Sequence, residues 1–470
     1  MLSKEHSEEE FTASKAANPL NGSMLQSNHE LQAPRHDWRL HPTAKYASYG
    51  VVRAIPPAET IRRVAPLMNI VGVTRVAEVT GLDNVGIPNF TTVRPRDRGE
   101  GISYYNGKGL TRAAAHAGAL MEAIERYSGE RCDLPVFYGD RAEMERQGPT
   151  IDPAEIIVPR AMEYRPELCL EWVEGFDLLS QRPTYLPLNA VIWPYEPPAG
   201  RPMLYDSGTN GLASGNTLEE ALCHALCEVI ERDASAVSDA SLDLAPAVAR
   251  VLLQLGLAAP EGDSSARAAR FPLIDLKTLP RRALALVRKL ERAGLLVYLR
   301  DVTSTAGIAT LDCAIVERRL DGRHLAHGGT GTHPDARVAA TRALTEAAQS
   351  RVGHIQGGRE DLSRIVGVPP VFDPDELYGR GTVRPFLSIA STQHSNIDDD
   401  IRFLLRRLSD DGFTQVVAVN LTRPEVRVPV VRVVVPRAES WSVFLTHGRS
   451  GRFGSRIARI LHGGAARSGA

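Results

Sequence analysis

The sequence contains no apolar run of transmembrane length, and its N-terminus lacks the basic-then-apolar order of a signal peptide. Its 5 cysteines are an odd and dispersed set, which excludes a disulfide framework and favours a reducing compartment. A formal net charge of −1 gives no electrostatic basis for binding nucleic acid or an anionic membrane. We therefore expect a cytoplasmic protein without a nucleic-acid or membrane partner.

The 470 residues are 43% hydrophobic and 24% charged, which is typical of a globular protein with one large or several medium domains. Residues 1–42 are polar with little periodicity, so we expect a disordered tail there. Residues 43–445 form the predicted domain, with an insertion at 236–275 that contains a flexible linker signature. Residues 446–470 are predicted to be a second tail.

Periodicity and turn residues predict strands and helices in a mixed order, which indicates an α+β fold of mixed β-sheets packed with helices. Helices are expected at Pro56–Met68, Pro280–Ala293 and Asp400–Ser409. Strands are expected at Ile70–Val79, Phe90–Val93, Leu295–Leu299, Ala309–Val316, Val416–Leu421 and Pro429–Pro436.

One octet pattern occurs three times. The segments Ala119–Arg126 and Ala225–Arg232 agree except at the third and fifth positions, and Ala343–Gln349, with Arg351 just beyond, is a looser copy. Each copy has helical period, so two oxygen-bearing side chains three residues apart share one helix face. These pairs are Glu122 with Glu125, Glu228 with Glu231, and Glu346 with Gln349.

A glycine-rich stretch precedes each of the three predicted helices. Helix N-termini behind flexible glycines expose N–H groups that suit phosphate, and paired carboxylates inside a helix suit Mg²⁺. Carboxylates repel a polyphosphate unless a metal lies between them. One copy alone would favour an ordinary amphipathic helix with a wet acidic face, but three copies favour a shared metal–nucleotide site.

Local signals around these helices allow more than one interpretation. Asn216 is a predicted N-cap, with Thr217 and Glu220 as a capping box, and Thr332 is the predicted cap of the third helix. Lys108 lies between two glycines, outside any Walker A spacing, and is either a phosphate or peptide contact or a plain turn lysine.

Two further groups have a simple structural alternative. Arg342 and Glu346 stand four residues apart, which fits a surface ion pair as well as contacts to phosphate and Mg²⁺. Cys223, His224 and Cys227 have no second cysteine pair to complete a tetrahedral metal site, so packed cysteines are the better interpretation.

The stretch from Asn210 to Thr217, continued to Glu228–Asp233, resembles the signature of the YcaO family. Gly107–Gly109 with the first acidic pair, and the third pair with Arg351, resemble the same family, and the resemblance covers Tyr46 to Pro436. It implies a YcaO-type fold with an ATP site between three acidic helices, ATP and Mg²⁺ as cofactors, and activation of peptide backbone amides to azolines, thioamides or amidines.

The resemblance also implies roles for individual residues. The expected metal ligands are Glu122, Glu125, Glu228, Glu231, Glu346 and Gln349. The expected ATP contacts are Arg53, Thr60, Lys108, Ser214, Asn216, Arg232 and Arg342. The family's upstream serine falls at Ala213 here, so Ser214 or Ser207 is expected to supply the hydroxyl.

Azoline-forming members of the family typically end in Pro-x-Pro-x-Pro, whereas this sequence ends Arg467-Ser468-Gly469-Ala470. We therefore expect thioamide formation on a peptide or protein substrate, with a sulfur donor and a TfuA-like partner. The alternatives are an azoline-forming cyclodehydratase and a non-catalytic ATP-binding accessory factor in a sulfur-transfer or methylthiolation pathway. A homodimer is compatible with either activity.

Overall fold

The computed structural model describes residues 37–48, 51–95, 103–156, 164–204, 208–240, 271–322, 324–358 and 373–439. Within them the strands form four sheets, antiparallel apart from the β10–β14 pair. The two small sheets are β1 (Tyr46–Ser48) with β2 (Val51–Arg53), and β3 (Arg75–Glu78), β4 (Asn89–Val93) and β5 (Tyr104–Lys108). One large sheet has the order β6 (Val136–Gly139), β7 (Leu170–Asp177), β15 (Val417–Asn420), β16 (Val430–Val434) and β9 (Leu212–Ser214), with β8 (Arg182–Pro187) also paired to β7. The other has the order β13 (Leu325–Thr332), β12 (Thr310–Glu317), β11 (Leu295–Asp301), β10 (Leu273–Asp275) and β14 (Val383–Pro385).

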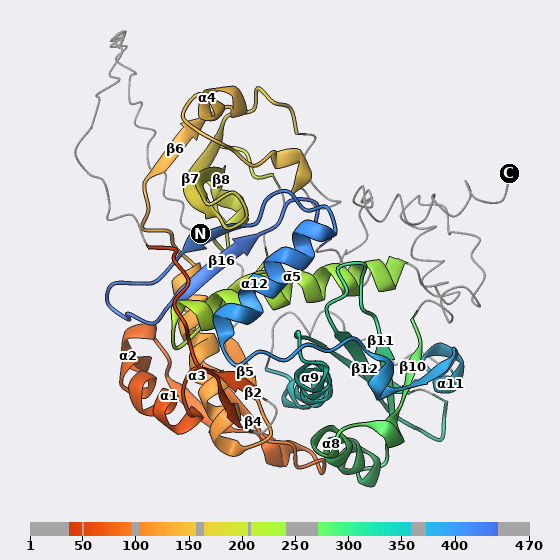
Figure 1. Ribbon diagram of the computed structural model, residues 1–470. Coiled ribbons are helices and arrows are strands. Elements are labelled where there is room, and N and C mark those ends of the chain that lie inside the picture. Colours follow the sequence, from red (N-terminus) through yellow and green to blue (C-terminus); the bar gives the residue numbers. More distant parts are fainter. Residues whose placement is uncertain are drawn as a thin grey trace, which may run out of the picture. The chain divides into compact units, whose positions relative to one another are not determined.

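Helices pack on these sheets, so the predicted α+β fold is confirmed (Figure 1). The helices of the described residues are α1 (Pro57–Val64), α2 (Met68–Val71), α3 (Arg112–Gly129), α4 (Arg141–Glu145), α5 (Leu218–Ala240), α8 (Arg281–Arg292), α9 (Ala336–Gln356), α11 (Pro374–Leu377) and α12 (Ile397–Asp410). Among these residues, no helix combines the length and the apolar character that a bilayer crossing requires.

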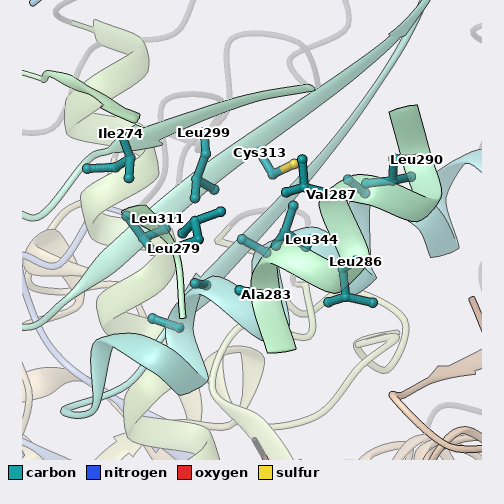
Figure 2. Close-up of a cluster of buried hydrophobic side chains, with 14 of the residues drawn as sticks. Ile274, Leu279, Ala283, Leu286, Val287, Leu290, Leu299, Leu311, Cys313 and Leu344 are labelled. Atoms are coloured by element: carbon teal, nitrogen blue, oxygen red, sulfur yellow. The ribbon is translucent and has the colours of Figure 1, made fainter. Parts of the chain in front are cut away.

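One hydrophobic core lies between α8, α9 and the sheet that contains β11 and β12 (Figure 2). The apolar positions of α8 recur at Ala283, Leu286, Val287 and Leu290, which places them on the one face that is buried. This packing fixes α9 against the sheet, and α9 carries the third acidic pair.

One predicted strand is wrong. Ile70 lies in helix α2, which ends at Gly72 with a φ of +84°, and the strand that follows is only Arg75–Glu78. Gly72 provides a left-handed helix end that a two-residue apolar period does not reveal. The other predicted helices and strands are present, with ends shifted by at most a few residues.

Two predicted flexible regions fall largely outside the described residues. Residues 236–240 continue α5 and residues 273–275 form β10, whereas most of the predicted insertion between them lies outside the description. Of the predicted N-terminal tail, only residues 37–42 are described, and there Trp38 stacks on Phe176 with ring centroids 5.9 Å apart. The tail therefore remains a prediction for residues 1–36, as does the one at the C-terminus.

The glycine-rich stretches before α3 and α9 are strands rather than flexible turns. A Cβ on Gly107 of β5 would strike the backbone of α3, and one on Gly329 of β13 would strike the backbone of α9. Gly215, which follows β9, has the same relation to α5. The glycines therefore allow each acidic helix to lie directly against a strand, which sets the position of its side chains.

We expect Gly107→Ala to lower the free energy of unfolding by about 1–3 kcal/mol, because the added methyl group must force α3 away from β5. Urea denaturation followed by circular dichroism measures this change. Gly208→Ala is the matched control, since no atom lies within 4 Å of its Cβ position. If both variants were equally stable, the close approach of β5 to α3 at Gly107 would not contribute to the stability of the fold.

Candidate functional site

Helices α3, α5 and α9 bring their acidic side chains together from distant parts of the sequence. The charge of Glu228 on α5 acts on Glu125 of α3, and the charge of Glu346 on α9 acts on Glu231 of α5. We call these residues, with their same-helix partners, the acidic cluster. It comprises Glu122, Glu125, Glu228, Glu231, Glu346 and Gln349.

Burial makes the ionised forms of Glu125 and Glu231 unfavourable when no metal is present. Burial, against the opposing charge of Arg126, raises the pKa of Glu125 to about 8, and Glu228 adds to the shift. Burial and then the charge of Glu346 raise the pKa of Glu231 to about 7. A divalent cation among the carboxylates would favour the ionised forms of both Glu125 and Glu231.

Basic residues of β5 and α9 enter the acidic cluster. Lys108, the last residue of β5, forms an ion pair with Glu346. Burial would raise the pKa of Glu346, but the charge and hydrogen bond of Lys108 lower it below its usual value. Arg342 reaches from α9 to α5, where its Nη2 lies 4.0 Å from Glu231 Oε2. Lys108 is therefore not a plain turn residue, and Arg342 is not confined to a pair on its own helix.

Arg232 lies at the solvent side of the cluster. Its side chain is exposed, yet its charge acts on both carboxyls of the α5 pair and on Glu346. An exposed cation beside buried carboxylates is placed to meet the outer part of a charged ligand.

Glu220, on the first turn of α5, joins the residues that were expected to contact ATP. Its carboxylate accepts hydrogen bonds from the Asn216 amide at 3.0 Å and from the Ala54 N–H at 2.8 Å. Arg53 Nε lies 3.6 Å from the same carboxylate, and Thr60 Oγ1 donates to Asn216 Oδ1 at 3.0 Å. Residues of β2, α1 and the start of α5 therefore form one hydrogen-bonded group.

Two predicted helix caps are wrong. Thr217 caps α5, because its Oγ1 accepts the N–H of Glu220 at 3.1 Å while the Asn216 side chain bonds to the Glu220 carboxylate. For α9 the N-cap is Asp335, and Thr332 instead ends strand β13. Sequence spacing favoured Asn216 and Thr332, but the Asn216 side chain bonds to Thr60 and Glu220, and the Thr332 hydroxyl bonds to that of Thr310.

Ser214 and Gln349 lie at the edges of the acidic cluster and are already hydrogen-bonded. The N–H of Ser214 donates to Glu125 Oε2 at 3.0 Å, and its hydroxyl donates to a backbone carbonyl of α3 at 3.1 Å. Gln349 Nε2 donates to the Asn106 carbonyl at 2.6 Å, which leaves Oε1 as its remaining acceptor for a metal. Ser207, the alternative hydroxyl, lies outside the described residues.

Arg126 and Arg432 belong to the site although the sequence analysis did not assign them. Arg126 Nη2 lies 3.3 Å from Glu122 Oε1, and Arg432, buried on β16, acts through its charge on Glu228. The repeat contained the signal for Arg126, since it holds the place in the first octet that Arg232 holds in the second. Arg432 is the one charged residue in the valine-rich strand β16, and this isolated charge could have indicated a functional residue.

A second group of metal-ligand types is buried elsewhere, with ligand atoms of Cys223, His333 and Asp400 within 4.8 Å of one another. Lys45 Nζ lies 2.5 Å from Asp400 Oδ2, so a cation already faces that carboxylate. His333 Nδ1 accepts the Asp335 N–H at 2.9 Å, whereas metal-bound histidines usually donate from their second nitrogen. We interpret the group as a buried ion-pair network, and the predicted packing of Cys223 in the core is confirmed.

The acidic cluster fits a metal–nucleotide complex better than a self-contained salt-bridge network. Among the described residues, Glu231 Oε2, Arg342 Nε and Arg126 Nη1 are buried without a hydrogen-bond partner. Native folds rarely leave such atoms unsatisfied. An unsatisfied carboxylate oxygen suits Mg²⁺, and unsatisfied guanidinium N–H groups suit phosphate oxygens.

Known proteins are similar to this chain in sequence and in fold. An uncharacterized protein of Methanothermobacter thermautotrophicus is 35% identical over 398 residues, which cover 83% of this chain and 96% of that protein. An uncharacterized protein in the tfuA 3′ region of Rhizobium leguminosarum bv. trifolii is 32% identical over 407 residues, which cover 82% and 88% of the two chains. The structure of YcaO from Methanopyrus kandleri bound with AMPPCP and Mg²⁺ superposes with a TM-score of 0.64 at 26% identity, covering 88% of this chain and 99% of that one.

A family model described as YcaO cyclodehydratase, ATP- and Mg²⁺-binding, matches residues 106–439. The match includes all three acidic helices. The chain belongs to the YcaO family, and its cofactors are ATP and Mg²⁺.

Proposed function

We propose that this protein uses ATP and Mg²⁺ to activate a backbone amide of a peptide or protein and replaces the amide oxygen with sulfur, giving a thioamide. The observation that carries the proposal is the acidic cluster, in which carboxyls from three helices meet unsatisfied guanidinium groups. The relative from a tfuA 3′ region supports a TfuA-like partner, and because family members that work with such a partner resemble thioamide synthases, we propose sulfur as the incoming atom.

In this proposal each group of residues has a separate task. The carboxylates of the acidic cluster hold Mg²⁺, which neutralises phosphate charge when bound. The group around Glu220, which includes Arg53, Thr60 and Asn216, holds the nucleoside side of ATP. Lys108, Arg342 and Arg232 contact the phosphates, and Ser214 holds Glu125 in place through its N–H.

The reaction balances without a nucleophilic residue of the enzyme. Hydrosulfide adds to the amide carbon, and the resulting oxyanion takes the γ-phosphoryl group of ATP, which leaves ADP. Phosphate then departs with the former amide oxygen, and loss of the added proton gives the C=S bond. The protein contributes chiefly the positioning of peptide, sulfide and ATP, which is worth several kcal/mol of the barrier in intramolecular reactions.

A cyclodehydratase is the second candidate, because the matching family model carries that description. There a Cys, Ser or Thr side chain of the substrate attacks its own neighbouring carbonyl, and an azoline forms. A side chain held beside its carbonyl has a high effective concentration, whereas sulfide must be delivered. The thioamide reaction is therefore expected to depend on a sulfur-delivering partner.

Mass spectrometry separates the candidates. We expect the purified protein, incubated with ATP, Mg²⁺, sulfide, a TfuA-like protein and a synthetic peptide library, to give products heavier by about 16 Da, as for exchange of oxygen by sulfur in an activated amide. Products lighter by about 18 Da at Cys, Ser or Thr, with no dependence on sulfide, would contradict the thioamide proposal in favour of an azoline. ATP binding without any change of peptide mass would indicate an accessory factor.

A further inference from the structure

His224 lies on the same face of α5 as Glu228 and Glu231, four and seven residues before them. It is half-buried, and the charges of Arg342, Arg53 and Lys108 act on its ring. Its Nε2 lies 3.5 Å from Nη2 of Arg342 on α9. The imidazole therefore connects two of the three acidic helices at a point that no motif of the sequence assigned.

The surroundings of His224 determine which nitrogen carries its proton. Burial and the charge of Arg342 hold the pKa of His224 well below its usual value, so the ring is neutral. A guanidinium can only donate, and therefore Nε2 must be the acceptor toward Arg342. Nδ1 then carries the proton, and the backbone of Ser214 on β9 partly opposes the lowering of the pKa.

Nη2 of Arg342 faces both His224 Nε2 and Glu231 Oε2. Arg342 Nη2 stops 4.0 Å from Glu231 Oε2, and that oxygen has no hydrogen-bond partner among the described residues. An arginine this close to a buried carboxylate usually closes into a short bidentate pair. Closure here would occupy a carboxylate oxygen that the proposed function gives to Mg²⁺.

We propose that His224 is a positioning residue that holds Arg342 off Glu231, leaving the carboxylate of Glu231 open to Mg²⁺ and the guanidinium of Arg342 open to phosphate. The inference rests on the proposed ATP site. It differs from a role as general base, because the lone pair of Nε2 already faces a cation, which reduces its basicity.

The Mg²⁺ dependence of ATP turnover tests this role. We expect His224→Ala to raise the half-saturating Mg²⁺ concentration roughly tenfold, the usual scale for groups that orient metal ligands, with much of the turnover recovered at high Mg²⁺. His224→Gln should restore the wild-type value, because a carboxamide can accept from Arg342 and also donate, as the neutral ring does. The matched control is His116→Ala on α3, whose ring stacks on Phe90 at 4.8 Å.

Two results would overturn the inference. The first is a loss of turnover in His224→Ala that glutamine does not rescue and that is independent of Mg²⁺, as expected for a general base. The second comes from ¹⁵N NMR of histidine-labelled protein without ligands, which should show His224 as the neutral Nδ1–H tautomer at pH 7; a protonated or Nε2–H ring would contradict it. Failure of the wild-type protein to bind ATP would instead overturn the proposed function, which the NMR result does not require.

Discussion

Replacing Glu231 by glutamine should lower Mg²⁺-dependent ATP turnover by about 100-fold or more. Changes to groups that only orient metal ligands cost tens- to hundreds-fold, so loss of a ligand should reach at least that scale. Glutamine keeps the shape of the side chain and cannot supply an anionic oxygen. Steady-state ATPase kinetics at several Mg²⁺ concentrations measure the change.

The same substitution should leave the fold intact or stabilise it. Because burial and Glu346 raise the pKa of Glu231 to about 7, this carboxyl is protonated more readily in the folded protein without metal than an ordinary glutamate would be, and glutamine resembles that form. The control is Glu291→Gln, an exposed glutamate on α8. Wild-type turnover in Glu231→Gln, or an equal loss in the control, would contradict a metal-binding role for Glu231.

Raising the pH from 6 to 8 should tighten Mg²⁺–ATP binding by up to about tenfold per pH unit for each proton released, because Mg²⁺ needs ionised carboxylates. The groups concerned are Glu231, with a pKa of about 7, and Glu125, with a pKa of about 8. Isothermal titration calorimetry in two buffers of different ionisation enthalpy counts the protons directly.

The metal-free protein should show the opposite trend. A carboxyl whose pKa is raised in the folded state contributes stability below its unfolded pKa, near 4.5, and that contribution is lost as pH rises through the folded value. Unfolding free energy without Mg²⁺ should therefore fall between pH 5 and pH 8, by up to about 6 kcal/mol for the two carboxyls together. Glu125→Gln should flatten this profile, and an unchanged slope in that variant would contradict the assignment.

The sequence predicted the acidic pairs because the repeat and the helical period are both local. Glu228 and Glu231 share a helix face wherever α5 packs, so their spacing alone indicated a common ligand.

The glycine-rich stretches before α3 and α9 were wrongly predicted to be flexible turns, for a physical reason. A strand that must lie against a helix backbone needs glycine as much as a turn does, and Gly107 and Gly329 are in strands.

Contacts between distant segments could not be predicted in the same way. Glu220 has the sequence signature of a capping box, yet its carboxylate also accepts the N–H of Ala54, which follows β2 and lies 166 residues away in the sequence. Arg432 enters the site only because β16 pairs with β9. Such roles depend on strand pairing, which a single sequence does not encode locally.

The most direct test of a shared site is calorimetric titration of ATP into wild-type protein and one glutamine variant from each acidic helix, with Mg²⁺ and with EDTA. The variants are Glu125→Gln on α3, Glu228→Gln on α5 and Glu346→Gln on α9. We predict Mg²⁺-dependent binding to the wild-type protein and at least tenfold weaker binding to every variant, on the scale expected for lost metal contacts. Wild-type affinity in any one variant would show that its helix does not contribute to a common site, and would contradict the account.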